Sequence, residues 1–146
     1  MTTMLSQIDV LNIYPSSQAG TIQELALGLF DLLTLSGYSL SQDEIETLIL
    51  AECRYYAGWA AFQAQEKAKV ALDSSLKIEC FEWSILEPVI RAHCNVVEAQ
   101  RIEALKSLGG AEFGLSASEA SQLYLEERAK LPQLACIEPP FSLELD

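Results

Sequence analysis

Basic residues are scarce in this chain of 146 residues, and its first third has none. Nine lysines and arginines stand against 21 aspartates and glutamates, which gives a formal net charge of −12. Arg54 is the first basic residue, and only acidic charges precede it. Proteins that grip nucleic acid neutralise its phosphates with lysine and arginine, so this composition argues against a role in holding DNA or RNA.

Long hydrophobic runs and a secretory signal are missing as well. The longest apolar stretch, in "ELALGLFDLLTLSG", is broken by Asp31 and is far shorter than the roughly 20 residues of a membrane-spanning helix. Residues 1–12 have neither the basic start nor the apolar core of a signal peptide, so we expect a cytosolic protein that does not enter a membrane. In that reducing environment we expect four free thiols: Cys53, Cys80, Cys94 and Cys136.

The sequence also lacks the known patterns for catalysis and metal binding. His93 is the single histidine, and Ile90 stands three residues before it, where a helical di-iron protein carries glutamate. No cysteine pair has the C-x₂-C spacing of zinc sites, and no G-x-S-x-G elbow occurs. We therefore predict no catalytic residue, no cofactor and no metal, and expect that the chain is not an enzyme. The alternative is a helical enzyme that uses His93 with Cys94.

The glycine-rich stretch "SLGGAEFGLSASEA", residues 107–120, is the nearest approach to a phosphate-binding loop. It carries Glu112 but no cation, and its spacing fits neither the dinucleotide-binding nor the P-loop pattern. We interpret Gly109 and Gly110 as the end of one helix and Gly114 as the turn into the next. This stretch is therefore expected to form the turn between two helices and not to bind phosphate.

What the chain does contain is enough apolar sequence for one domain. Half of its residues are hydrophobic, and its mean hydropathy is +0.17. A chain of this length can bury a real core. A positive mean hydropathy is unusual for a soluble monomer, so we also expect apolar surface that is covered by partners, including other copies of the chain.

Four segments carry the pattern of a helical capping box, in which Ser or Thr is followed three residues later by Glu. They are Thr21–Glu24, Ser41–Glu44, Ser84–Glu87 and Ser116–Glu119. The pattern predicts four helices. The first covers 22–35 and ends at Gly37, and the second and longest covers 42–72. The third runs from after Ser84 to 108 with Pro88 in its first turn, and the fourth covers 117–131 and stops at Pro132.

The stretch "LKIECFEW" between the second and third helices has the alternation of a half-buried strand. Leu76, Ile78 and Cys80 alternate there with Lys77 and Glu79. It is either a strand or a short extended link, and a strand would need to pair with one end of the chain or with a neighbouring subunit. The candidates within the chain are "IDVLNIYP" and "PPFSLELD".

These elements predict a mainly α fold. About four helices form a small bundle, with a short extended or strand link between the second and third helices and with extended terminal arms. We expect a single helical domain over residues 1–131, followed by an extended C-terminal arm over residues 132–146.

Two groups of apolar residues are candidates for partner binding. On the predicted second helix, Tyr55, Trp59 and Phe62 follow at i, i+4 and i+7 and share a face, which is either core packing or a surface that docks on a neighbouring subunit. The second group follows two prolines in the tail, where an extended segment can anchor on a neighbour by strand addition or by inserting apolar side chains. It consists of Phe141, Leu143 and Leu145.

The helix order, the extended "LKIECFEW" link and the tail "EPPFSLELD" together resemble the small helical head–tail connector proteins of tailed bacteriophages, the adaptor or head-completion class. The resemblance implies a non-enzymatic structural adaptor. It would form a homo-oligomeric ring at the portal and neck, bind portal and tail or stopper proteins, and let DNA pass through its lumen without sequence-specific binding. It also implies a place in the virion, and in the host cytoplasm before assembly. The alternative is a small acidic cytosolic helical module that binds or regulates a basic partner protein.

Overall fold

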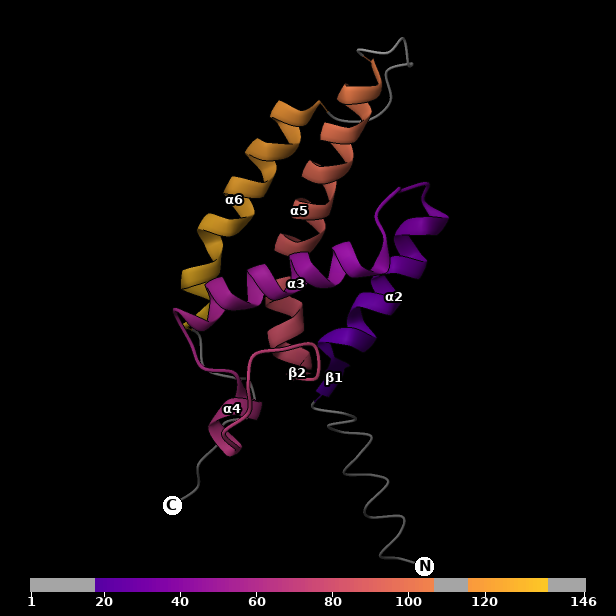
Figure 1. Ribbon diagram of the computed structural model, residues 1–146. Coiled ribbons are helices and arrows are strands. Elements are labelled where there is room, and N and C mark those ends of the chain that lie inside the picture. Colours follow the sequence, from indigo (N-terminus) through magenta and orange to yellow (C-terminus); the bar gives the residue numbers. More distant parts are fainter. Residues whose placement is uncertain (1–17, 107–115, 137–146) are drawn as a thin grey trace, which may run out of the picture.

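The computed structural model describes residues 18–106 and 116–136. Its elements follow in the order β1 (Gln18–Thr21), α2 (Ile22–Leu35), α3 (Gln42–Ala57), α4 (Gln63–Lys67), β2 (Lys77–Glu79), α5 (Cys80–Lys106) and α6 (Ala117–Ala135). The predicted mainly α fold is confirmed. In Figure 1, α5 and α6 lie side by side in opposite directions, and α3 crosses α5. Helix α2 lies on the opposite side of α5 from α6.

Helix α2 has the predicted bounds because both of its ends are fixed locally. The Thr21 hydroxyl accepts from the Glu24 N–H at 3.2 Å, and the Glu24 carboxylate accepts from the Thr21 N–H at 3.4 Å, which completes the capping box. At the other end Gly37 has φ = +87°, and the Tyr38 N–H bonds the Leu33 carbonyl at 3.0 Å. This is a Schellman ending, whose left-handed residue favours glycine.

The predicted strand forms at β2, and its partner is the segment directly before α2. Strands β1 and β2 are antiparallel, with Gly20 opposite Ile78 and Thr21 opposite Lys77. The neighbouring 74–76 segment accepts the first free N–H groups of α2, at 3.0 Å from Ile22 and at 2.9 Å from Gln23. The stretch "IDVLNIYP" that we considered as partner lies outside the described residues.

The predicted alternation along this strand is wrong at its end. Leu76 and Ile78 are buried as expected, but Glu79 is also buried and Cys80 is exposed. The reason is that α5 already begins at Cys80, so the two-residue period gives way to a helical one. Of the four cysteines, the thiols of Cys53 and Cys94 are buried.

The predicted long helix over 42–72 is wrong, because α3 ends at Ala57. Its capping box is present as expected, with the Ser41 hydroxyl 3.2 Å from the Glu44 N–H. After Gly58 the chain turns and brings Phe62 into the core, fully buried, with its ring 4.8 Å from that of Tyr56. Burial of this ring outweighs the helix propensity of the alanine-rich segment that follows.

Helix α5 starts about one turn earlier than predicted. The expected capping box at Ser84 is absent, since the Ser84 hydroxyl donates to the Phe81 carbonyl at 2.7 Å. Instead, the Glu82 carboxylate accepts the Glu79 N–H at 2.9 Å and caps the helix start. Pro88 therefore stands inside α5 and not in its first turn; its ring is exposed on the outside of the helix.

Helix α6 continues past the predicted stop at Pro132 and ends at Ala135. Its start is as predicted, with the Ser116 hydroxyl accepting from the Glu119 N–H at 3.1 Å. The extra turn buries Ala135 beside Leu131, which is fully buried. The first residues of the expected C-terminal arm over 132–146 are therefore helical, and residues 137–146 lie outside the described part.

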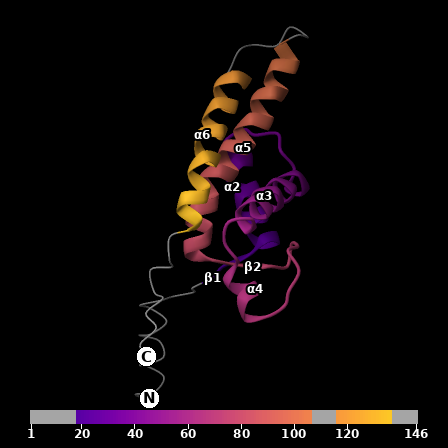
Figure 2. The ribbon, with the colours of Figure 1, turned by 90° about the vertical axis from the view of Figure 1, so that its left-hand side faces the viewer.

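The core lies where α2, α3 and α5 meet over the small sheet. Its largest fully buried apolar side chains come from these helices, from the turn before α4, from β2 and from the end of α6. They are Ile22, Ile45, Ile49, Phe62, Ile78, Leu86, Ile90 and Leu131. The upper parts of α5 and α6 extend beyond this core as a two-helix projection (Figures 1 and 2).

Candidate functional site

The three aromatic residues proposed for partner binding do not share one helix face. Tyr55 is half-buried near the end of α3, with its ring 6.4 Å from that of Trp59. Trp59 lies past the end of α3 and is 51% exposed, whereas Phe62 is fully buried. Of these three residues, only Trp59 therefore presents a large aromatic surface to solvent. The other candidates, Phe141, Leu143 and Leu145, lie outside the described residues.

The histidine is bonded to a buried carboxylate that the sequence reading missed. His93 Nδ1 on α5 lies 3.0 Å from Oε1 of Glu52 on α3, and the Tyr124 hydroxyl on α6 donates to the same oxygen. The Glu52 side chain is 1% exposed. Glu52 stands seven residues after Ile45 and three after Ile49, so its place in the buried stripe of α3 was the available sequence signal.

The Arg128 side chain on α6 lies over two tyrosine rings beside this cluster. The Arg128 guanidinium lies 4.2 Å from the centre of the Tyr55 ring and 5.8 Å from that of Tyr124. Burial, together with the hydrogen bond to Glu52 and the nearby Glu52 charge, raises the pKa of Tyr124. Among the described residues, Oε2 of Glu52 has no hydrogen-bond partner. The cluster joins α3, α5 and α6 through one carboxylate, and we interpret it as a tie that holds α6 against the core.

A second buried carboxylate holds the starts of two helices together. Glu82 is fully buried, and its two oxygens accept the N–H groups of Glu79, at 2.9 Å, and of Gln63 at the start of α4, at 3.1 Å. Burial raises its pKa to about 7, helped by the nearby charges of Glu79 and Glu66 and opposed by the two hydrogen bonds. Burial also raises the pKa of Cys53 to about 12, so that thiol is not a reactive thiolate at neutral pH.

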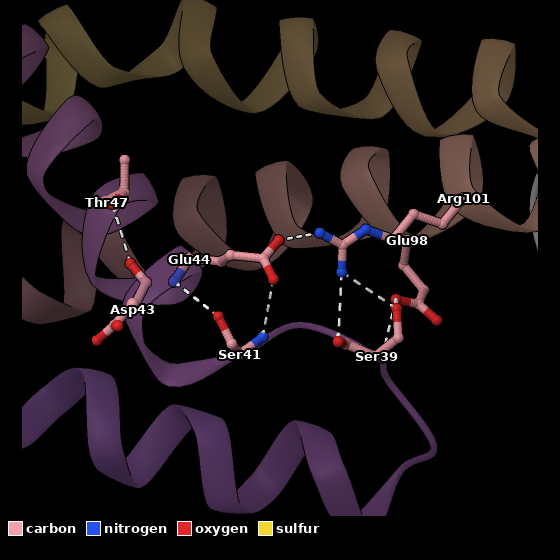
Figure 3. A network of polar contacts seen from close by, with 7 residues as sticks. All are labelled: Ser39, Ser41, Asp43, Glu44, Thr47, Glu98 and Arg101. Carbon is pink, nitrogen blue, oxygen red and sulfur yellow. Dashed lines mark hydrogen bonds and ion pairs between the residues drawn. The ribbon is translucent and has the colours of Figure 1, made fainter.

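Figure 3 shows an exposed polar network between α5 and the segment that leads into α3. Glu98 accepts the N–H and the hydroxyl of Ser39 at 3.0 and 2.8 Å. Arg101 donates to the Ser39 carbonyl at 3.3 Å and pairs with Glu44. Charges so close to solvent are weak individually, and here they fix the position of the α3 start on α5.

A groove of about 210 Å³ runs between α2 and α5. We call it the α2–α5 groove. Its α5 wall consists of Trp83, Glu87 and Arg91, and its α2 wall of Glu24, Leu25, Gly28, Leu29 and Leu32. Glu87 and Arg91 pair at 2.9 Å on the α5 wall, and Glu24 adds an acidic group to the α2 wall beside the leucines.

The described residues contain neither a metal-binding cluster nor a membrane-spanning helix. Within residues 18–106 and 116–136, no three His, Cys, Asp or Glu side chains come together in a way that would hold a metal ion. Nor does any helix in these ranges have the length and apolar character needed to cross a membrane.

No protein-family model, curated protein or solved structure matches this chain. The function must therefore be inferred from its own surfaces and contacts.

Proposed function

We propose that this protein is a non-enzymatic structural adaptor of a tailed-phage virion. In this proposal, identical subunits form a ring at the portal or neck and join the head to the tail around the DNA channel. Portal and tail or stopper proteins are its neighbours, and DNA passes through without being bound.

The observation that carries the proposal is the exposure of leucines on two different sides of the subunit. On α2, Leu32 is 45% and Leu35 is 87% exposed; on α6, Leu123 is 45% and Leu134 is 37% exposed. Helices α2 and α6 lie on opposite sides of the molecule, with α5 between them (Figure 1). A closed ring needs two unlike faces that meet head to tail, and such a pair of apolar faces supplies them.

The charge of the chain supports the same proposal. A net charge of −12 repels the phosphates of DNA, so an acidic lumen lets DNA slide without adhering. The tie at Glu52 supports a rigid subunit, because it anchors α6 to the core through a buried hydrogen-bonded group.

Electron microscopy of the concentrated protein tests the proposal, alone and mixed with the portal protein encoded in the same genome. We expect rings with an open centre, either free or seated on the portal. Dispersed monomers in both samples, or particles limited to two subunits, would contradict it. A monomer that binds a basic protein but no portal would favour the acidic regulatory module.

A further inference from the structure

We infer that α6 of one subunit docks in the α2–α5 groove of the next copy. The docking element is the outer stripe of α6, which we call the α6 ridge; it consists of Leu123, Glu127, Lys130 and Leu134. This inference rests on the proposed ring and names the two surfaces that form its subunit contact.

The groove has the features of an unfilled helix-packing site. Leu25, Gly28, Leu32 and Leu35 follow at intervals of three, four and three residues, so they form one stripe along α2. Leu35 extends this stripe beyond the groove and is 87% exposed. Such a stripe normally packs against another helix. Here Leu25 is half-buried against the core, whereas Leu32 and Leu35 remain exposed.

Gly28 is the residue that best shows the need for an outside partner. Glycine in a helix interior costs about 1 kcal/mol relative to alanine. A Cβ built at Gly28 would meet no atom within 4 Å, so packing within the subunit does not require glycine there. The missing side chain leaves room for the close approach of a second helix to the α2 backbone.

The α6 ridge matches the groove in length. Its four residues are spaced by four, three and four positions and therefore share one face of α6. From Leu123 to Leu134 the ridge is about 16 Å long, and from Leu25 to Leu35 the α2 stripe is about 15 Å long, at 1.5 Å per residue. Both stripes thus run for about three helical turns.

The ion pairs of the two surfaces are complementary. The ridge has leucines at its ends and an ion pair in its middle, with Lys130 and Glu127 3.3 Å apart. The groove carries the Glu87–Arg91 pair on one wall. When the ridge enters the groove, Arg91 can bond Glu127 and Lys130 can bond Glu87. Glu24, the third charge of the groove, keeps its hydrogen bonds to Thr21. Ion pairs between subunits fix orientation and register more than they add affinity.

The ridge is on α6 and the groove is bordered by α2, and these two helices lie on opposite sides of α5 (Figure 1), so this contact is not mutual between two copies. Each subunit offers its groove to one neighbour and its ridge to the other. A contact of this type continues from copy to copy, and it closes into a ring when the rotation per subunit permits.

Leucine substitutions with matched controls on the same helices test the inference. Leu32→Glu and Leu123→Glu place a charge in the contact, and we expect each to weaken association by at least about tenfold in sedimentation velocity. Leu27→Glu and Leu125→Glu are the controls, because these leucines are 46% and 58% exposed but lie off the two stripes. We expect the controls to associate like the unchanged protein.

A charge exchange tests the pairing itself. Arg91→Glu and Glu127→Arg should each weaken association, because like charges then face each other. The double variant should restore it, since the pair is re-formed with reversed sign. Urea denaturation of each variant shows whether the fold is intact.

The tryptophan of the groove gives an independent signal. In a Trp59→Phe background Trp83 is the remaining tryptophan, and its emission should shift to shorter wavelength as the subunits associate.

Four outcomes would overturn the inference. If rings persist with unchanged association in both Leu32→Glu and Leu123→Glu, the subunits meet through other surfaces, and the proposed function stands without this contact. If association weakens equally in the test and control variants, the subunits associate through nonspecific apolar contacts. If only Leu32→Glu weakens association, and the unchanged protein forms particles of two subunits, α2 of one copy packs against α2 of the other. A protein that stays monomeric alone and with the portal would remove both this contact and the proposed ring.

Discussion

Two glutamates on α3 show how burial changes the role of the same side chain. Glu44 at the start of the helix is 40% exposed and pairs with Arg101; Glu52 near its end is 1% exposed and contacts His93 and Tyr124. Water competes for every contact of Glu44, whereas Glu52 depends on its protein partners. Exposed ion pairs therefore contribute little to the free energy of unfolding, although they position segments. Removing either the buried carboxylate or one of its partners is expected to destabilise the fold strongly.

The largest effect is expected from removing the buried carboxylate. Glu52→Ala should lower the free energy of unfolding by about 3 kcal/mol, because it leaves the Tyr124 hydroxyl and the His93 ring without their buried acceptor. Urea denaturation measures the loss. Glu46→Ala, on the same helix at a half-exposed position, should change it by only about 0.5 kcal/mol. Equal losses in the two variants would show that the burial of Glu52 has no special role.

A second effect is expected in the pH dependence of stability, from Glu82. Its pKa is about 7 in the folded protein against an ordinary value of 4.5, so the folded state binds the proton more tightly. Its contribution is therefore fully present below about pH 4.5 and is lost as the pH rises toward 7. The change is on the order of 2 kcal/mol once solvent screening is allowed for.

Glu82→Gln removes this titration, so its stability should vary less between these two pH values than that of the unchanged protein. Urea denaturation across the range, with Glu98→Gln as an exposed-network control, measures the difference. Parallel profiles for the unchanged protein and Glu82→Gln would contradict the assignment.

The smallest effect is expected in the network of Figure 3. Arg101→Ala removes the contacts with Ser39 and Glu44, and we expect a loss of about 0.5 kcal/mol because the groups are partly exposed. The loss should shrink further in concentrated salt, which screens exposed charges. Thermal unfolding at low and high salt measures it. A loss as large as that of Glu52→Ala, independent of salt, would remove the distinction between the two glutamates.

Elements fixed by neighbouring residues were predictable from the sequence. The bounds of α2 and the starts of α3 and α6 follow from caps whose two partners are three residues apart. A strand or a short extended link was predicted around β2, because the apolar residues Leu76 and Ile78 stand two positions apart; both are buried. Pro132 was misread as a stop, since its place within α6 depends on the burial of Ala135.

The candidate sites were less predictable, because their partners are far apart along the chain. Glu52 meets His93 over 41 residues and Tyr124 over 72. The aromatic stripe was predicted on an unbroken helix, and the burial of Phe62 breaks that helix. The α2–α5 groove depends on how two helices pack, although the apolar spacing along α2 was visible in the sequence.

The sequence by itself determined the helical class, the caps of α2, α3 and α6 and the acidic character of this protein, because composition and hydrogen bonds over three residues act locally. Only the tertiary structure decided where α3 ends, which glutamates are buried and which leucines remain exposed. Those outcomes depend on which distant side chains share the core, and the free energy of burial is a property of the packed chain and not of any short segment.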